Sequence, residues 1–124
     1  MPMARVLIVE DDQDLNAAYQ MILKKAGHDV ESALNGEIAL TMAKSFKPQL
    51  ILLDLLMPIM GGLGFLQHYN LDEHQDVKVV IFTNMENSPE VNETYNLGAS
   101  RCIIKSWTAP QNLAKVVDDV LQQQ

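Results

Sequence analysis

The sequence predicts an α/β fold in which a doubly wound, parallel sheet of five strands is covered by helices on both faces. Three short segments, residues 6–9, 50–53 and 79–82, are almost continuously apolar. Such runs are typical of strands that are buried on both faces of a sheet. Amphipathic helical patterns lie between them, and right-handed crossover helices are the connections that cover a parallel sheet.

Two weaker segments complete the five strands. Residues 30–33 have the mixed pattern of an edge strand, and residues 102–104 form a shorter apolar run. Along the chain a strand is followed by a helix five times, which is the order of an open α/β sheet. We therefore expect one domain that spans residues 1–124.

The first two helices have clear apolar stripes and end signals. The first carries its stripe from Leu15 to Leu23 and ends before Gly27, a residue suited to the left-handed position that follows a helix. The second begins after Asn35, a good N-cap residue, and stops before Pro48.

The last three helices follow the third, fourth and fifth strands. Residues 62–69 form a short helix, and Ser88 followed by Pro89 is the pattern of an N-cap and first helical residue. Thr108 and Gln111 have the spacing of a capping box for the final helix. The apolar stripe of that helix contains Leu113, Val116, Val117, Val120 and Leu121.

Composition restricts the partners and the compartment. With 9 basic and 16 acidic residues the net charge is −7. The electrostatic field of such a charge repels the phosphates of nucleic acid, unless the basic residues gather on one face. No apolar run approaches the roughly eighteen residues of a membrane span, and the N-terminus lacks a secretory signal. The single cysteine, Cys102, fits a reducing compartment. We expect a cytoplasmic protein with no membrane contact and no direct binding to nucleic acid.

Polar residues follow four of the predicted strands. The acidic run 10–12 (Glu-Asp-Asp) follows the first strand, Asp54 the third, Thr83 the fourth and Lys105 the fifth. Ligands of open parallel sheets bind at the carboxyl ends of the strands, so these side chains should share one rim. Each residue alone is explained by the polar character of surface loops. Together they predict a functional site.

The residue types at this rim indicate phosphoryl transfer. Clustered carboxylates repel one another unless a cation neutralises them. Oxygen ligands without histidine or cysteine favour Mg²⁺, with Mn²⁺ as the alternative. Lys105 can pair with Asp54 or with phosphoryl oxygens, and the Thr83 hydroxyl can donate to the same group. We interpret Asp54 as the nucleophile that accepts the phosphoryl group.

Four stretches in register resemble the receiver domain of bacterial two-component response regulators, over essentially the whole chain. They are residues 6–12 (VLIVEDD), 54–58 (DLLMP), 82–84 (FTN) and 103–105 (IIK). The resemblance implies the flavodoxin-like (βα)5 receiver fold with strand order 2-1-3-4-5. It also implies that a histidine kinase or a histidine phosphotransfer protein donates a phosphoryl group from phosphohistidine to Asp54.

The resemblance assigns further roles by position. Asp11 would bind Mg²⁺ directly, Glu10 through water, and Leu56 through its backbone carbonyl, beside Asp54. Asp12 would be a supporting acid. Thr83 would bond to the phosphoryl group and switch the face formed by the fourth helix, fifth strand and fifth helix. The domain would catalyse only its own phosphorylation and dephosphorylation, and would act as a signalling phosphoacceptor and not as an enzyme.

The output partner is expected to be a downstream protein or an output domain outside this chain. The domain would be a monomer or would dimerise when phosphorylated. Two other classes fit less well: a pseudo-receiver that only binds proteins, and a small phosphatase with an aspartyl nucleophile. The acids, Thr83 and Lys105 argue against the first class. The second class places an Asp-x-Asp motif on its first strand, which residues 10–12 do not supply.

The chain departs from the receiver pattern near Lys105. Ser106 replaces the proline whose peptide bond is cis in relatives, and a cis bond before a non-proline residue costs about 3 kcal/mol, which favours trans. Cys102 stands where many relatives carry an aromatic switch residue, and the nearby Trp107 is either part of the output face or a partly exposed packing residue.

Two further departures concern the loops around Asp54. Gly61 replaces an aspartate common in relatives and is expected to loosen its turn. Leu56 and Met85 are both apolar at positions that control access of water in the family, so we expect a long-lived phosphorylated form. His28, His68 and His74 are expected in solvated loops, with no part in a phosphohistidine relay.

Overall fold

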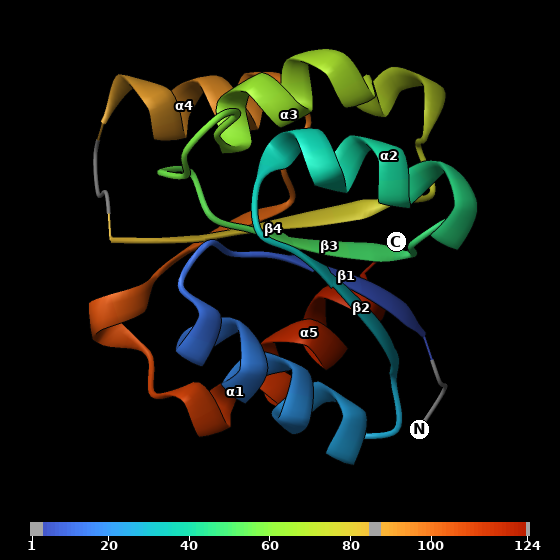
Figure 1. Cartoon of the computed structure of the whole chain (residues 1–124), viewed down its shortest axis with the longest axis vertical. Coiled ribbons are helices and arrows are strands. Elements are labelled where there is room, and N and C mark those ends of the chain that lie inside the picture. Colours follow the sequence, from blue (N-terminus) through green and yellow to red (C-terminus); the bar gives the residue numbers. More distant parts are fainter. Residues whose placement is uncertain (1–3, 85–87, 124) are drawn as a thin grey trace.

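A computed structural model of the chain describes residues 4–84 and 88–123 and contains one five-stranded sheet. All neighbouring strands are parallel and their order is β2-β1-β3-β4-β5, as predicted. The crossovers place α2, α3 and α4 on one face of the sheet and α1 and α5 on the other (Figure 1). The strands are β1 (Arg5–Val9), β2 (Asp29–Ala33), β3 (Leu50–Leu53), β4 (Lys78–Thr83) and β5 (Arg101–Ile104).

Two hydrophobic clusters fill the space between the sheet and its helices. One lies under α2 (Gly36–Phe46), α3 (Gly62–Tyr69) and α4 (Pro89–Asn96), and includes Phe65 and Leu53. The other lies under α1 (Gln13–Lys25) and α5 (Leu113–Leu121), and includes Leu23 and Phe82. Alternate residues of β1, β3 and β4 enter opposite clusters, which explains why these strands are apolar without a break.

The predicted end signals act as expected for α1, α2 and α4. The Asn35 side chain accepts a hydrogen bond from the Ile38 N–H, and Ser88 accepts one from the Val91 N–H. Gly27, with φ of 97°, occupies the left-handed position after α1, where a side chain would be strained. These end signals are local, so the sequence alone could specify them.

The predicted capping box of the last helix is wrong. Residues Lys105–Trp107 and Pro110–Asn112 form separate 3₁₀ turns, and α5 begins only at Leu113, without a side-chain cap. The reason is Pro110, which pushes the preceding Ala109 into an extended conformation (φ −65°, ψ 141°). Because Ala109 is extended, no helical turn can start directly after Thr108, and helical structure resumes only at Pro110.

The prediction of solvated histidines fails for His28, which is buried. Its Nδ1 accepts a hydrogen bond from the Ala4 N–H at 3.3 Å, and its Nε2 lies 3.3 Å from Asp118 Oδ1 on α5. His28 therefore joins the turn after α1 to α5. His68 is exposed as expected, whereas the half-buried His74 stacks on Tyr69, with ring centroids 4.3 Å apart.

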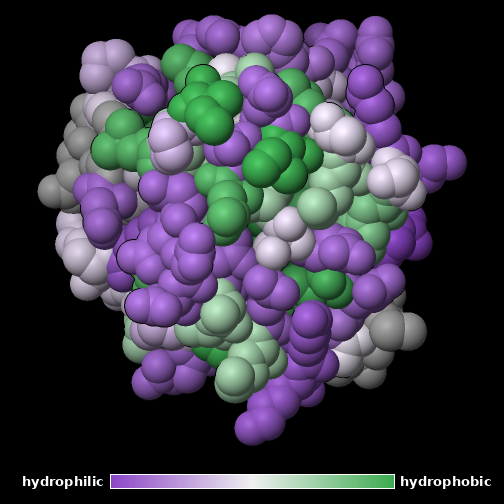
Figure 2. All heavy atoms as spheres, in the orientation of Figure 1, coloured by the Kyte–Doolittle hydropathy of each residue, from purple (hydrophilic) through white to green (hydrophobic). Residues whose placement is uncertain are grey.

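The surface agrees with the acidic composition. The face seen in Figure 2 is mostly hydrophilic, and hydrophobic side chains gather mainly over α2 and α3. Exposed large hydrophobic residues include Ile38 on α2 and Ile59 in the loop before α3. Among the residues that the structure describes, no helix has the length and apolar character needed to cross a bilayer.

Candidate functional site

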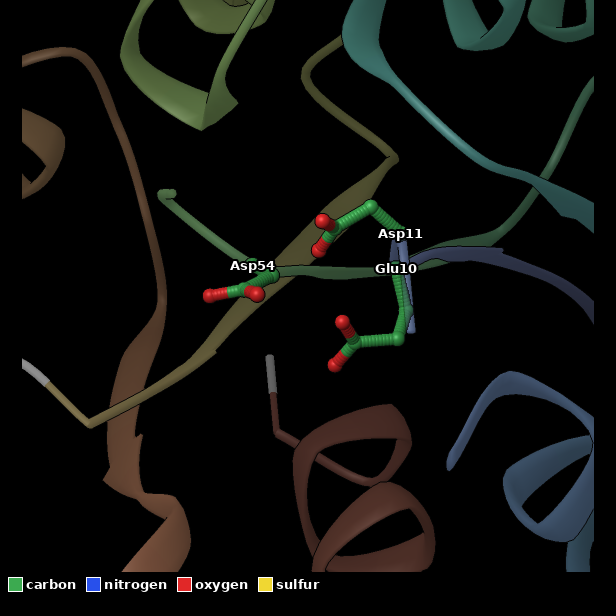
Figure 3. A group of neighbouring side chains, drawn as sticks. All are labelled: Glu10, Asp11 and Asp54. Atoms are coloured by element: carbon green, nitrogen blue, oxygen red, sulfur yellow. The ribbon is translucent and has the colours of Figure 1, made fainter. Parts of the chain in front are cut away.

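Three carboxylates meet at the carboxyl end of the sheet, as the sequence predicts. Glu10 and Asp11 follow β1, Asp54 follows β3, and the register that pairs Val9 with Leu53 brings the two strand ends together. One carboxylate oxygen from each of the three acids lies within 4.8 Å of the other two (Figure 3). Glu10 and Asp54 are buried, whereas Asp11 is exposed and opens the cluster to solvent.

Lys105 brings a cation to these acids from the other side of β4. Its Nζ donates to Asp54 Oδ2 at 3.0 Å and also donates to Glu10 Oε1 in a short contact. The Lys105 side chain is only 13% exposed, so the ammonium is held between the two buried carboxylates. The predicted pairing of Lys105 with Asp54 is present, and the pairing with Glu10 was not predicted.

Backbone hydrogen bonds fix both buried acids. The Asp54 N–H donates to the Val9 carbonyl at 3.0 Å, which extends the sheet by one residue beyond β3. The Leu55 N–H donates to Asp54 Oδ1 at 2.8 Å, and the Asp12 N–H donates to Glu10 Oε2 at 3.1 Å. Each carboxylate therefore has one oxygen bound to the backbone and another bound to Lys105.

Glu10 and Lys105 hold their protons more firmly than isolated groups do. Burial raises the pKa of Glu10, and the charge of Asp54 adds to this, although the hydrogen bond from Lys105 opposes it. Burial alone would lower the pKa of Lys105, but its bonds to Glu10 and Asp54 outweigh burial and raise it. The Glu10 shift comes mainly from burial and the Lys105 shift from its two carboxylates, and the three acids leave an excess of negative charge over one ammonium. A further cation would relieve that excess.

The glycines after Asp54 are required by close packing, and the looser turn expected at Gly61 stays a prediction. A Cβ on Gly61 would lie 2.5 Å from the Leu55 carbonyl oxygen, and one on Gly62 would lie 2.4 Å from the Asp54 carbonyl oxygen. The Gly62 N–H also donates to the Leu55 carbonyl at 3.0 Å. The start of α3 is therefore pressed against the backbone of the candidate nucleophile.

Thr83 and Leu56 complete the predicted set at the rim. Thr83 is buried at the end of β4 and is in register with Ile104, the residue before Lys105. The Leu56 side chain is 60% exposed, and the role of its backbone carbonyl as a metal ligand stays a prediction. Met85 lies outside the described residues, so the prediction that rests on it is untested.

The departures near Lys105 have modest structural effects. No peptide bond within the described residues is cis, so Ser106 follows Lys105 through a trans bond. Cys102 is partly buried, and burial raises the pKa of its thiol. Trp107 is 73% exposed, which makes it a surface residue of the turn that follows Lys105.

Two polar residues of α1 support the acids and were not predicted in these roles. The Asp12 side chain caps α1 by accepting hydrogen bonds from the N–H groups of Asp14 and Leu15. Asn16 is buried, and its amide donates to the Glu10 carbonyl at 2.9 Å. An aspartate before an apolar helical stripe is a cap signal, and an asparagine inside such a stripe needs a buried partner. Both signals were present in the sequence.

Comparisons with known proteins agree with this geometry. Residues 6–118 match the family model of the response regulator receiver domain. The chain is 30% identical to the probable transcriptional regulator ycf27 of Porphyridium aerugineum, over 98% of this chain and 50% of that protein. It is also 30% identical to the DNA-binding dual master transcriptional regulator RpaA of Synechocystis, over 92% of this chain and 48% of that protein. The chain thus spans about half the length of these relatives.

Solved structures show the same likeness. The chain superimposes on a CheY-like response regulator receiver domain protein from Methanospirillum hungatei with a TM-score of 0.88 and 25% identity, over 97% of this chain and 94% of that one. It superimposes on the chemotaxis protein CheY4 of Vibrio cholerae with a TM-score of 0.85 and 30% identity, over 97% and 100% of the two chains.

Proposed function

The chain belongs to the response regulator receiver domain family, and we propose that its Asp54 accepts a phosphoryl group from a histidine kinase or a histidine phosphotransfer protein. Phosphoacceptance in two-component signalling is the function of this family, and the proposal concerns the residues that perform it here. The observation that carries it is the Asp54 carboxylate, which is buried beside Glu10 and Asp11 and hydrogen-bonded to Lys105.

The acidic cluster fits a divalent cation. Its three carboxylates offer oxygens within 4.8 Å of one another and already have an excess of negative charge. Oxygen ligands of this kind suit Mg²⁺, and Mn²⁺ is the alternative. We assign Glu10, Asp11 and Asp54 as the side chains that hold the ion, together with the backbone carbonyl of Leu56. When bound, the ion supplies positive charge that neutralises the oxygens of the transferred phosphoryl group.

The hydrogen bonds of Asp54 distinguish its two oxygens. Oδ1 is held by the Leu55 N–H, whereas Oδ2 faces the ammonium of Lys105. We assign Oδ2 as the nucleophile that attacks phosphorus in line with the departing phosphohistidine nitrogen. The P–N bond breaks, its electron pair stays on the imidazole, and an acyl phosphate forms on Asp54. Lys105 then donates to the phosphoryl oxygens that replace the carboxylate charge.

The switch that follows is assigned to Thr83. It ends β4 next to the strand that carries Lys105, so one phosphoryl group can bond to both residues. A ligand shifts a conformational equilibrium only by its differential affinity for the two states. The bonds from Thr83 and Lys105 to the phosphoryl group would supply this differential affinity. They would thereby alter the face formed by α4, β5 and α5. The domain would then act as a signalling switch whose only catalysis is its own phosphorylation and dephosphorylation.

The output is proposed to lie outside this chain. Two relatives of about twice its length are named as transcriptional regulators, and one of them as DNA-binding. The net charge of −7 argues that DNA contacts belong to another domain or a partner protein. The face of α4, β5 and α5 would contact that partner, or a second copy of this domain after phosphorylation.

Intact-mass measurement after incubation with acetyl phosphate and Mg²⁺ tests the assignment of Asp54. We expect one phosphoryl adduct on the wild type and none on Asp54→Ala. Asp119→Ala is the matched control, because Asp119 is an exposed carboxylate on α5 that pairs with Lys115. Equal adducts on the wild type and Asp54→Ala would refute the assignment.

The lifetime of the phosphorylated form is a separate proposal. The side chain of Leu56, two residues after Asp54, offers no polar group that could orient a water molecule toward phosphorus. We expect slow hydrolysis, and faster hydrolysis in Leu56→Asn, whose amide can hold a water molecule. The decay of the adduct after removal of acetyl phosphate measures both rates. Loss of the wild-type adduct within seconds would contradict this proposal.

A further inference from the structure

A pocket of about 590 Å³ lies at the amino end of the sheet, away from the acids. Its walls come from the second half of α2, the end of α3, the start of β1 and the segments that lead into β3 and β4. The strands begin on the right of Figure 1, and the acids follow them at their other ends. A volume between roughly 300 and 1,000 Å³ is typical of sites for small molecules. The residues assigned to phosphoryl transfer take no part in its lining.

This pocket collects positive charge in an acidic protein. Arg5, Lys44 and Lys47 line it, and among the residues that the structure describes only two acids, Glu73 and Asp76, do so as well. Three cations and two acids leave one net positive charge, whereas the whole chain carries −7. Within residues 4–84 and 88–123, the three cations form no ion pair with an acidic side chain. Unpaired cations around a concave surface attract anions.

Lys47 has an unfavourable backbone conformation at this pocket. It ends α2 with φ of 52° and ψ of 65°, in the left-handed region that favours glycine or asparagine. It also precedes Pro48, and a residue before proline prefers an extended conformation. Two hydrogen bonds hold it: its N–H donates to the Ala43 carbonyl at 3.0 Å, and Arg5 Nε donates to its carbonyl at 2.8 Å. Strain of this kind is concentrated at functional sites, which points to a use for the exposed Lys47 side chain.

The rest of the pocket wall is apolar and aromatic. Leu40 and Val77 contribute aliphatic surface. Tyr69 and His74 also line the pocket, and their rings are stacked with centroids 4.3 Å apart and planes 8° apart. Such a wall favours a ligand with an apolar body, and the cations beside it favour a negative charge on that body.

A carboxylate is the anion that best matches these cations. One carboxylate neutralises the single net positive charge of the pocket. A guanidinium group also has the planar geometry that binds a carboxylate through two parallel hydrogen bonds. The Arg5 Nε is bonded to the Lys47 carbonyl, and this bond leaves both Nη groups of Arg5 available.

We propose that this pocket is a second binding site of the domain, which takes a small carboxylate with an apolar body. The carboxylate would pair with Arg5, Lys44 and Lys47, and the body would lie against the aliphatic and aromatic wall. Binding would relieve the mutual repulsion of the three cations. The site does not depend on the proposed function of Asp54, because it uses other residues at the opposite end of the sheet.

Titration of the ¹⁵N-labelled protein with benzoate, followed by two-dimensional NMR, tests this site. The amides of Gln49 and Val77 report on the pocket, and the amide of Asp11 reports on the acidic site. Acetate lacks the apolar body and benzyl alcohol lacks the charge, so these two compounds are the ligand controls. Lys47→Gln is the test variant. Lys24→Gln is its matched control, because Lys24 is also an exposed lysine in the last turn of a helix, but on the other face of the sheet.

We expect benzoate to shift the amides of Gln49 and Val77 with a Kd on the order of 1 mM, and to leave the Asp11 amide unshifted. Lys47→Gln should weaken this binding about two- to fivefold, the range for a partly exposed ion pair. Lys24→Gln should match the wild type. Acetate and benzyl alcohol should each bind at least about fivefold more weakly than benzoate, because each lacks one half of the recognition.

Lys47→Gly separates binding from folding. Glycine adopts the left-handed conformation without strain, so the melting temperature should rise by about 2–4 °C. The affinity for benzoate should fall as it does in Lys47→Gln. A lysine with a purely structural role would instead lower the melting temperature when replaced and leave the affinity unchanged.

Three results would overturn this site: no saturable shift of the pocket amides below about 20 mM benzoate, equal affinities in Lys47→Gln and Lys24→Gln, or equal affinities of benzoate and either ligand control. The proposed function is tested separately by the acetyl phosphate experiment. A wild type that binds benzoate in the pocket but takes up no phosphoryl group would refute that function and leave the second site intact.

Discussion

The acids and the cation of the site come from two structurally different parts of the sheet. Glu10, Asp11 and Asp54 follow the central strands β1 and β3, and every residue of β3 is buried. Lys105 follows the edge strand β5, whose four residues are all partly exposed. The anionic half of the site is therefore built into the core, whereas the cation is carried by an element with less packing around it.

The backbone hydrogen bonds of the two buried acids and of Lys105 show the same difference in packing. The backbone of Glu10 continues the sheet through a bond to Ala33, and that of Asp54 continues it through a bond to Val9. Lys105 instead begins a 3₁₀ turn that closes with a 3.3 Å bond from the Thr108 N–H to the Lys105 carbonyl. A change at the acids should therefore disturb fold and chemistry together, whereas a change near Lys105 should affect chemistry more than fold.

Gly62→Ala should produce the largest loss of stability, because it adds a methyl group to the closely packed acidic half of the site. Its methyl group would lie 2.4 Å from the Asp54 carbonyl oxygen, and overpacking of this kind costs about 3 kcal/mol of unfolding free energy. Gly64→Ala is the control in the same helix, since its methyl group would meet only the flexible Met60 side chain, at 3.0 Å. Urea unfolding of both variants gives the comparison, and equal stabilities would contradict the packing argument.

Lys105→Met should have the next largest effect, and Mg²⁺ should reduce it. The substitution leaves Glu10 and Asp54 without the hydrogen bonds of their shared cation, which should cost about 2 kcal/mol in the absence of metal. Mg²⁺ should stabilise this variant more than the wild type, because the ion would neutralise a larger excess of negative charge. Melting temperatures with and without Mg²⁺ measure the difference. An equal Mg²⁺ response in both proteins would argue against binding at these acids.

The pH dependence of stability should reveal the raised pKa values of Glu10 and Lys105. The pKa of Glu10 is raised above its ordinary 4.5, so its contribution to stability is complete below 4.5 and is lost as pH rises through the higher folded value. The pKa of Lys105 is also raised, above its ordinary 10.5. Its contribution to stability is therefore complete below pH 10.5 and is lost as pH rises through the higher folded value.

Glu10→Gln isolates the acidic part of this dependence. Without Mg²⁺, the unfolding free energy of the wild type should increase relative to that of Glu10→Gln as the pH is lowered from about 8 to about 5. Many other carboxylates titrate in this range, but they are common to both proteins and cancel in the difference. A difference that stays constant with pH would show that Glu10 has no raised pKa.

The sequence was sufficient for the features that depend on local patterns. Apolar runs predicted four of the five strands, the mixed pattern of residues 30–33 predicted β2, and the residues that follow the apolar runs predicted which side chains meet at the rim. The caps at Asn35 and Ser88 were also predictable, because an N-cap bonds within its own first turn. Family resemblance supplied the strand order, which the topology confirms.

Features that depend on distant contacts were not predictable. Gly61 is required because a Cβ would strike the carbonyl of Leu55, and no local pattern reveals that approach. His28 is buried because α5, about ninety residues later, brings Asp118 to it. The bond from Lys105 to Glu10 likewise joins the last strand to the first. Each of these contacts forms only when the sheet is assembled.

The smallest expected effect concerns the helix start that the sequence predicted wrongly. Thr108 does not cap α5, so Thr108→Ala should change the unfolding free energy by less than about 0.5 kcal/mol. Asn35→Ala, which removes a cap that does accept the Ile38 N–H, should cost about 1 kcal/mol. Urea unfolding of both variants separates the two positions. A cost at Thr108 equal to that at Asn35 would mean that Thr108 does cap a helical turn, and that the turn after Lys105 is held as firmly as the capped start of α2.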